Sequence, residues 1–357
     1  MSKPLVMHGD CLNVLTDLPD AGIDVVITDP PYGLSDLTPA QVGAALVAWA
    51  GGDRGRVPDA RGFMGSDWDA FVPPPAVFDQ LLRVLKPGGH MAVFAGARTQ
   101  DIMGVSLRLA GFEIRDTVMW LYGHGMPKSV RLEQGFGKRG DEANARRFAG
   151  YAATLKPAYE PIIIARKPLQ RTILDNASEF GTGAVNVAGA AVPFVSDRDA
   201  AEAAGKNRHA TWGTLPGGNR VFGDFTMVAS RKDYNAPGRW PSNVVLDQDA
   251  AHAVDDAGPF NARAGAGASR FFYCARASSR ERPVGADGSG HVTVKPLALM
   301  SWLVTLLAPP GRARILDPFA GSGTTGEAAV LAGHDAILIE REEKYVPLIL
   351  QRLRRAV

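Results

Sequence analysis

The chain has 357 residues, of which 46% are hydrophobic and 21% are charged, a globular balance that excludes wholesale disorder. Lysine and arginine number 39 against 37 acidic residues, so a net charge of +2 excludes a massively basic protein that coats nucleic acid. Two cysteines, Cys11 and Cys274, exclude a disulfide scaffold and a four-cysteine zinc site, and they suit a reducing cytoplasm. The longest apolar run, residues 297–310, is shorter than the ~20 residues of a membrane span, so we expect no membrane segment.

The first third of the chain alternates β-branched strands with helical patterns. The spacing predicts strands at residues 5–8, 23–28, 90–95 and 112–121, and helices at 11–18, 76–85 and 99–110. Lys86-Pro87-Gly88-Gly89 is expected to stop the second of these helices. Residues 34–75 are rich in Gly, Pro and Asp, with one helix predicted at 39–50. This βαβα order predicts a parallel sheet with helices on its faces.

The middle of the chain loses this rhythm. Between residues 123 and 290, glycine, proline and asparagine break the sequence into short pieces, and one clear strand remains at 161–165. The same segment holds 22 lysines and arginines against 17 acidic residues. This local positive charge fits an inserted nucleic-acid-binding segment, and it fits a solvated, loop-rich domain equally well.

The end of the chain returns to the α/β pattern, with predicted helices at 294–308 and 343–354 and predicted strands at 313–316 and 335–339. Gly321-x-Gly323-x-x-Gly326 follows one strand and opens a helix, where glycines let a ligand approach backbone N–H groups. Glu340 ends the next strand, and a carboxylate there can accept hydrogen bonds from ribose hydroxyls. The motif therefore favours an adenosine-containing ligand, although dinucleotide cofactors use the same spacing.

Asp29-Pro30-Pro31-Tyr32 also stands at the carboxyl end of a predicted strand. The two prolines stiffen the turn and remove two N–H donors, so the Asp29 carboxylate and the Pro30 carbonyl can face one point as acceptors. The exocyclic amine of a nucleobase offers two matching N–H donors. Its lone pair is conjugated with the ring, and two acceptors that pull on its hydrogens favour a tetrahedral, nucleophilic nitrogen. Tyr32 offers a flat face for stacking.

Asp29–Tyr32 together with Asp317-Pro318-Phe319-Ala320-Gly321-Ser322-Gly323 strongly resembles the S-adenosylmethionine-dependent DNA amino-methyltransferases. The catalytic motif precedes the cofactor motif, which resembles the β-class order of that family. The resemblance implies a Rossmann-like methyltransferase fold with a mostly parallel sheet, a circularly permuted motif order and an inserted target-recognition region. It covers residues 5–33, 76–121 and 291–350, and more loosely 122–170.

Carried over residue by residue, the resemblance implies a catalytic set and a cofactor set. The catalytic residues would be Asp29, Pro30, Pro31 and Tyr32. The cofactor, S-adenosylmethionine, would be held by Asp10 at the adenine, Glu340 at the ribose, Asp317 near the amino group, and Phe319, Gly321, Gly323, Thr293 and Lys295 around the methionine end. The histidines show no metal-ligand spacing, and methyl transfer from a sulfonium needs no metal.

The same resemblance divides the chain into three parts. Residues 1–168 would be the catalytic part, 169–290 the target-recognition region and 291–357 the cofactor-binding part. Residues 34–75 are interpreted either as a lid that orders on DNA binding or as a passive surface excursion. The implied partner is duplex DNA with the target base flipped out, and a homodimer is left open. Candidates for phosphate contact are Lys128, Arg131, Arg270, Arg276, Arg280 and Arg282.

The preferred function is site-specific methylation of adenine N6. In the family pattern, Asp at the first position of the four-residue catalytic motif, here the tetrad Asp29–Tyr32, is associated with adenine. Cytosine-N4 methylation is the nearest alternative, since the same acceptors serve either amine. RNA or protein-amide methylation is weaker, because those relatives more often carry Asn at position 29. An NAD-dependent oxidoreductase would leave Asp10 and Asp29–Tyr32 unexplained, and an inactive DNA-binding protein conflicts with the intact tetrad. The sequence leaves three biological roles open: restriction-modification, phage protection and regulation.

Overall fold

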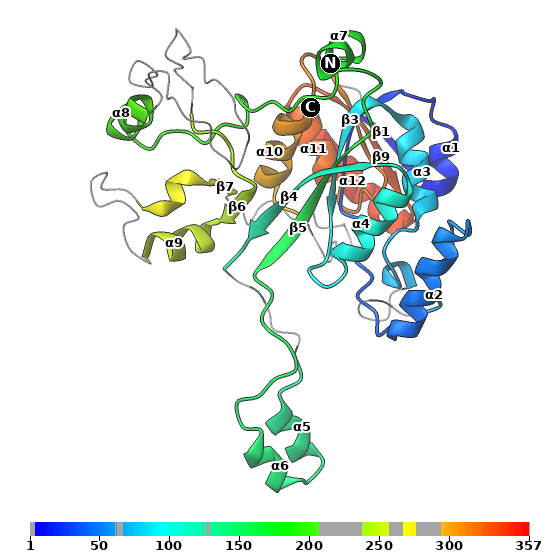
Figure 1. The fold of residues 1–357 in the computed structure, drawn as a ribbon, viewed down its shortest axis with the longest axis vertical. Helices are drawn as coiled ribbons and strands as arrows, with labels where there is room; N and C mark the ends of the chain where they lie inside the picture. The colour runs from blue at the N-terminus through cyan, green and yellow to red at the C-terminus, as the bar shows by residue number, and fades with distance from the viewer. Residues whose placement is uncertain are drawn as a thin grey trace, which may run out of the picture.

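The protein is described by a computed structural model that covers residues 4–60, 62, 67–123, 125, 129–206, 238–256, 267–275 and 294–356. The strands are β1 Pro4–His8, β2 Ile23–Thr28, β3 Leu85–Phe94, β4 Glu113–Leu121, β5 Tyr159–Arg166, β6 Val244–Asp247, β7 Tyr273–Ala275, β8 Arg314–Asp317 and β9 Asp335–Glu340. Within these ranges they form one nine-stranded sheet in the order β1-β9-β8-β2-β3-β5-β4-β6-β7 (Figure 1). Every neighbouring pair is parallel except the two pairs that β5 makes.

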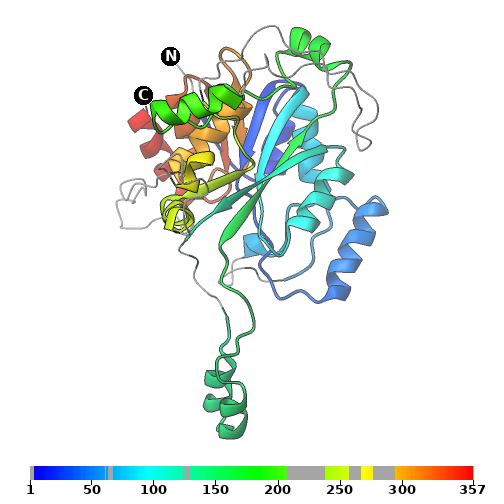
Figure 2. The ribbon, with the colours of Figure 1, turned by 60° about the vertical axis from the view of Figure 1, so that its left-hand side comes forward.

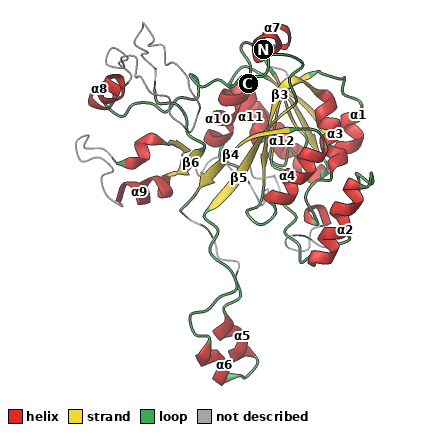
Figure 3. Cartoon of the chain, in the orientation of Figure 1, coloured by secondary structure: helices red, strands yellow, loops and turns green. Residues whose placement is uncertain are grey.

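Helices cover both faces of this sheet (Figure 3). The α-helices are α1 Cys11–Thr16, α2 Pro39–Ala50, α3 Pro75–Val84, α4 Gln100–Leu109, α5 Leu132–Lys138, α6 Glu142–Arg147, α7 Ile173–Phe180, α8 Asp197–Lys206, α9 Gln248–Asp256, α10 Leu297–Leu307, α11 Thr324–Leu331 and α12 Val346–Ala356. Short 3-10 helices are η2 Asp67–Asp69, η4 Ala268–Phe271 and η6 Glu343–Tyr345. No helix in the described ranges is long and apolar enough to cross a membrane.

The hydrophobic core forms two layers, one on each face of the sheet, because successive side chains of β2 point to opposite faces. Val26 packs with the buried side chains of α1, α3 and α4, whereas Val25 and Ile27 pack with those of α10 and α11. Side chains of a strand alternate between faces, so a continuous apolar run such as Val25–Ile27 is the pattern of a strand buried on both sides. All six residues of β2 are buried, which agrees with its place inside the sheet.

The pairing of β2 with β8 confirms the predicted permuted fold. Val25 and Val26 lie beside Ile315 and Leu316 in a parallel register. The two motif loops, which leave the carboxyl ends of these strands, are therefore neighbours although about 290 residues separate them in sequence. Figures 1 and 2 also place both ends of the chain on the same side of the molecule, where α12 contacts β1. The fold class is the expected Rossmann-like sheet of mostly parallel strands.

The start of β3 differs from the prediction. The segment Lys86-Pro87-Gly88-Gly89 follows the end of α3, but it lies within a strand that begins at Leu85 rather than at His90. Register with β2 jumps from the pair Ile23–Leu85 to the pair Val25–His90, and Gly88 has φ +74°, so the segment forms a bulge. Backbone bonds between Gly88, Gly89 and Lys167 hold it.

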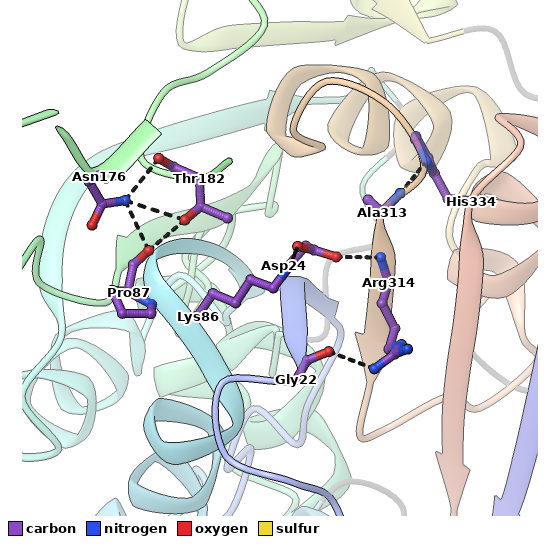
Figure 4. A network of polar contacts seen from close by, with 9 residues as sticks. All are labelled: Gly22, Asp24, Lys86, Pro87, Asn176, Thr182, Ala313, Arg314 and His334. Atoms are coloured by element: carbon purple, nitrogen blue, oxygen red, sulfur yellow. Dashed lines mark hydrogen bonds and ion pairs between the residues drawn. The ribbon is translucent and has the colours of Figure 1, made fainter. Parts of the chain in front are cut away.

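Polar side chains close the amino edge of the sheet around this bulge (Figure 4). Asp24 accepts from Lys86 Nζ at 2.6 Å and from the backbone N–H of Arg314 at 2.7 Å, so it ties β2 to β3 and β8. The Pro87 carbonyl accepts from Asn176 and Thr182 at 3.0 and 2.5 Å. These bonds satisfy backbone groups that the bulge leaves without a strand partner.

The middle segment contains more regular structure than predicted. The strand expected at 161–165 is confirmed as β5, and β6 and β7 continue the sheet beyond β4 by parallel pairing. The helices α5 and α6 form a hairpin between β4 and β5 that projects away from the sheet (Figures 1 and 2). Short strands with few β-branched residues, such as Tyr273–Ala275, give too weak a periodic signal to be recognised in the sequence.

Candidate active site

Four carboxylates line the carboxyl edge of the sheet in the order of the strands that carry them. Asp10 follows β1, Glu340 ends β9, Asp317 ends β8 and Asp29 follows β2. Ligands of open parallel sheets bind beyond the carboxyl ends of the strands. The sequence-predicted cofactor and catalytic residues are thus brought to one edge, in one row, from four separate parts of the chain.

Asp29 is the centre of a partly buried cluster. Its Oδ1 accepts from the Tyr32 hydroxyl at 2.8 Å, and its Oδ2 accepts from Lys295 Nζ at 2.6 Å. Glu160 of β5 lies next to both donors, with its Oε2 3.0 Å from the Tyr32 hydroxyl and 3.3 Å from Lys295 Nζ. The ammonium of Lys295 also lies 5.0 Å from the centre of the Phe94 ring. Glu160 was not expected from the sequence, and Lys295, expected beside the methionine carboxylate, contacts Asp29 here.

The electrostatics of this cluster keep Lys295 charged and Tyr32 protonated. Burial lowers the pKa of Lys295, but the carboxylates of Asp29 and Glu160 outweigh burial and raise that pKa above its ordinary value. Burial, together with the same two carboxylates, raises the pKa of the Tyr32 hydroxyl well above its usual range. A buried cation between two carboxylates is tolerated because it is paired.

The loop after β2, which carries the predicted catalytic residues, is held by Asp69, a residue of η2 that is 2% exposed. Its carboxylate accepts from the backbone N–H groups of Tyr32, Gly33 and Leu34 at 2.8, 2.9 and 3.3 Å. Gly33 has φ +67°, a conformation that favours glycine, and Thr99 Oγ1 donates to the Tyr32 carbonyl at 2.6 Å. The segment 34–75 therefore returns to brace the loop that precedes it.

Asp317 connects the catalytic and cofactor motifs. It accepts from Thr28 Oγ1 at 2.7 Å, from Thr325 Oγ1 at 2.6 Å and from the Phe319 N–H at 3.1 Å. Burial raises the pKa of Asp317 to about 6, and the charge of Asp29 adds to this effect against the three hydrogen bonds. A buried carboxylate at this junction favours a positively charged group of a ligand beside it.

The glycine motif shapes the turn between β8 and α11. Gly323 has φ +81° at the start of α11, and a Cβ there would come within 3.0 Å of the Ile349 side chain in α12. The glycine is therefore required by the backbone and by packing, whatever the ligand. The Gly321 N–H donates to Glu340 Oε2 at 2.7 Å, and the Glu342 N–H donates to Oε1 at 2.8 Å. Each carboxylate oxygen keeps one lone pair for a further donor.

Of the residues predicted to contact DNA, one is exposed, one is buried, and the others lie outside the described residues. Arg131 is exposed at the start of α5. Arg270 is 4% exposed and lies 3.6 Å from Asp199 and 3.8 Å from Glu202, so the expectation that it contacts phosphate is wrong for this buried side chain. The remaining cofactor and DNA candidates lie outside the described residues: Lys128, Arg276, Arg280, Arg282 and Thr293.

A family model described as DNA methylase, covering N6 and N4 methyltransferases, matches residues 23–351. The chain belongs to this methylase family. It is 22% identical to the Type II methyltransferase M.HindIII of Haemophilus influenzae, over 98% of this chain and 94% of that one. It is 38% identical to the Type II methyltransferase M.HinfI, also of Haemophilus influenzae, over 22% of this chain and 21% of that one.

Among solved structures, the cytosine-N4-specific PvuII DNA methyltransferase matches with a TM-score of 0.51 and 12% identity. The match covers 98% of this chain and 89% of that chain, a likeness that shows the fold. Enzymes of the N6 and N4 methylase family use S-adenosylmethionine to methylate DNA, so S-adenosylmethionine is the cofactor of this methylase and DNA is its substrate.

Replacing Asp69 with Ala in this methylase removes the acceptor of three backbone amides in the loop that carries the predicted catalytic residues. We expect kcat to fall about 100-fold, because small displacements of reacting groups have effects of this size. The affinity for S-adenosylhomocysteine should stay within about twofold, since Asp69 contacts the loop after β2 and not the cofactor turn. Transfer of labelled methyl groups to DNA and calorimetric titration give the two values.

Asp79→Ala is the matched control for this prediction. Asp79 lies in α3 and pairs with Arg54 at the same side of the sheet, away from the catalytic loop. Its loss should lower thermal stability and leave kcat near that of the wild type. Equal kcat in the Asp69 and Asp79 variants would contradict the bracing role of Asp69.

Proposed function

We propose that this methylase transfers the methyl group of S-adenosylmethionine to the N6 amine of an adenine flipped out of duplex DNA, at specific sites. The observation that carries the proposal is the Asp29 carboxylate at the end of β2, one strand away from the buried Asp317 of β8. This arrangement sets an acceptor for an amine beside the row of cofactor carboxylates. The aspartate at position 29 supports adenine over cytosine through the family pattern.

The residues of the carboxyl edge fit the proposed cofactor. Glu340, which is 7% exposed, keeps free lone pairs toward a ribose, and Asp10 is exposed beyond β1, where an adenine amine would lie. Asp317 would face the amino group of the methionine moiety, near Phe319 and the turn at Gly321 and Gly323. When bound, S-adenosylmethionine supplies an electrophilic methyl group.

The catalytic loop prepares the target nitrogen. The Asp29 carboxylate and the Pro30 carbonyl accept the two amine hydrogens, which withdraws them from the plane of the base and frees the nitrogen lone pair. Proline at positions 30 and 31 supplies no N–H group that would compete for these acceptors. The Tyr32 ring stacks on the base, and the bonds from Asp69 and Thr99 hold the loop in place.

A base inside a duplex cannot present its amine to Asp29, so the target must be flipped out, at a cost of a few kcal/mol of unstacking. Both adenine and cytosine offer an amine of the same geometry, and the solved relative described above acts on cytosine N4. The region 169–290 is proposed to read the target site, with β6 and β7 anchoring it to the sheet.

Identification of the methylated nucleoside tests this proposal. The protein would be incubated with unmethylated DNA and methyl-labelled S-adenosylmethionine, and the DNA would be digested to nucleosides and separated. We expect the label in N6-methyl-2′-deoxyadenosine. Label in N4-methylcytosine would reassign the target base, and absence of label across many DNA sequences would support an inactive binding protein instead.

A further inference from the structure

The helical hairpin between β4 and β5, residues 129–158, stands clear of the body of the protein (Figures 1 and 2). Its two legs are joined by backbone bonds from Leu132 to Tyr151 and from Ala153 to Val130, both at 3.1 Å. Its helices pack on each other through Phe136, which stacks on Phe148 at 5.6 Å between ring centres. The hairpin is therefore a small unit with backbone bonds and ring packing of its own.

The surface of this hairpin is basic. It contains six lysines and arginines against three acidic residues, and the cations are all exposed: Arg131, Lys138, Arg139, Arg146, Arg147 and Lys156. Within the described residues, no salt bridge joins the hairpin's arginines to an acid. Leu155 and Val130 are 91% and 66% exposed on the legs. Exposed arginines without acidic partners are suited to phosphate groups.

The position of the hairpin relates it to the target pocket. β4 ends and β5 begins at the edge of the sheet that carries Asp29, because β5 runs antiparallel to β3. Glu160, two residues after the hairpin, belongs to the Asp29 cluster. We propose that the hairpin is an arm that contacts the phosphate backbone of duplex DNA beside the flipped base. This inference rests on the DNA substrate of the proposed function.

Arg146→Ala with Arg147→Ala tests the arm, and Arg354→Ala with Arg355→Ala is the matched control. Both pairs are exposed arginines in the last turn of a helix, α6 or α12, so both variants lose the same charge. We expect the α6 variant to bind duplex DNA about tenfold more weakly, and its salt slope to fall by about 2 if each arginine contacts one phosphate. The α12 variant should bind as the wild type does.

The affinities would be measured by fluorescence anisotropy with a labelled duplex and S-adenosylhomocysteine, over a series of salt concentrations. If the two variants have equal DNA affinity and equal dependence of that affinity on salt, the proposal that the hairpin contacts DNA is wrong. A change of oligomeric state in the α6 variant alone, seen by sedimentation with unchanged DNA affinity, would assign the hairpin to a second copy of the chain. The identity of the methylated base is unaffected by either result, so the proposed function is tested separately.

A second inference follows from the occupancy of Asp29. Both of its carboxylate oxygens already accept a hydrogen bond, from Tyr32 and from Lys295. The target amine therefore shares the carboxylate with two other donors, and Asp29 becomes a stronger acceptor for the amine when either donor leaves it. A buried ammonium or hydroxyl that loses its partner is costly unless another acceptor takes its place.

Glu160 is positioned to be that acceptor. Its carboxylate lies 3.0 Å from the Tyr32 hydroxyl, which has one hydrogen to give and two carboxylates within reach. It lies 3.3 Å from Lys295 Nζ, an ammonium that also lies 5.4 and 5.0 Å from the centres of the Tyr32 and Phe94 rings. The structure assigns Glu160 as a positioning residue that takes over Tyr32 and Lys295 when the target amine occupies Asp29.

Glu160→Gln tests this exchange, since the amide keeps the size of the side chain but is a weaker acceptor. We expect kcat to fall about thirtyfold, with KM for S-adenosylmethionine within about twofold, because Asp29 remains occupied. In this background Tyr32→Phe should raise kcat several-fold, since removing the hydroxyl removes a competitor for Asp29. A purely structural role for Glu160 predicts a double variant that is no faster than Glu160→Gln.

Glu113→Gln is the matched control. Glu113 begins β4 and pairs with Arg166 at 2.7 Å, at the opposite end of the same pair of strands. It should lower thermal stability without changing kcat. A wild-type kcat in Glu160→Gln, or losses that multiply when Tyr32→Phe is added, would overturn the exchange. Detection of the methylated nucleoside in the wild type shows independently that the reaction itself occurs.

Discussion

Parallel pairing of β2 with β8 is the constraint on which the whole site depends. It brings together two loops that are distant in sequence, and the hydrogen bond from Thr28 to Asp317 fixes them across 289 residues. The proposed catalytic residues Asp29–Tyr32 follow β2, and most of the residues proposed to hold the cofactor follow β8 and β9. The reacting groups can meet at this edge because the loops that follow parallel strands all lie at the same edge of the sheet.

The charged groups of the Asp29 cluster are paired with one another. Asp29, Lys295, Tyr32 and Glu160 form a partly buried group in which the ammonium is compensated by two carboxylates. In the proposed mechanism an exchange of partners favours catalysis, because the Asp29 carboxylate that accepts from the target amine also accepts from Lys295 and Tyr32. Asp69 and Glu160 have different roles in this proposal. Asp69 fixes the backbone of the loop after β2, and Glu160 accepts from Tyr32 and Lys295 when they leave Asp29.

Sequence reasoning located the elements whose signal is local. The predicted bounds of β2 agree with the structure, because a β-branched run ends at a proline turn, and the helix predicted at 39–50 is α2, which the Thr38 side chain caps. Asp69 and Glu160 could not be predicted, since their roles depend on contacts across 37 and 128 residues. Arg270 failed for the same reason: its charge is visible in the sequence, but its burial beside Asp199 is not.

The most direct test of this account is the Asp29→Ala variant, measured for both cofactor binding and methyl transfer. We expect S-adenosylhomocysteine to bind this variant within a few-fold of its wild-type affinity, because Asp317, Glu340 and the glycine turn remain, while transfer of label to DNA is lost. Undiminished transfer would remove Asp29 from the mechanism. A loss of cofactor affinity as large as the loss of methyl transfer would contradict this expectation. It would show that the loops after β2 and β8 do not act separately.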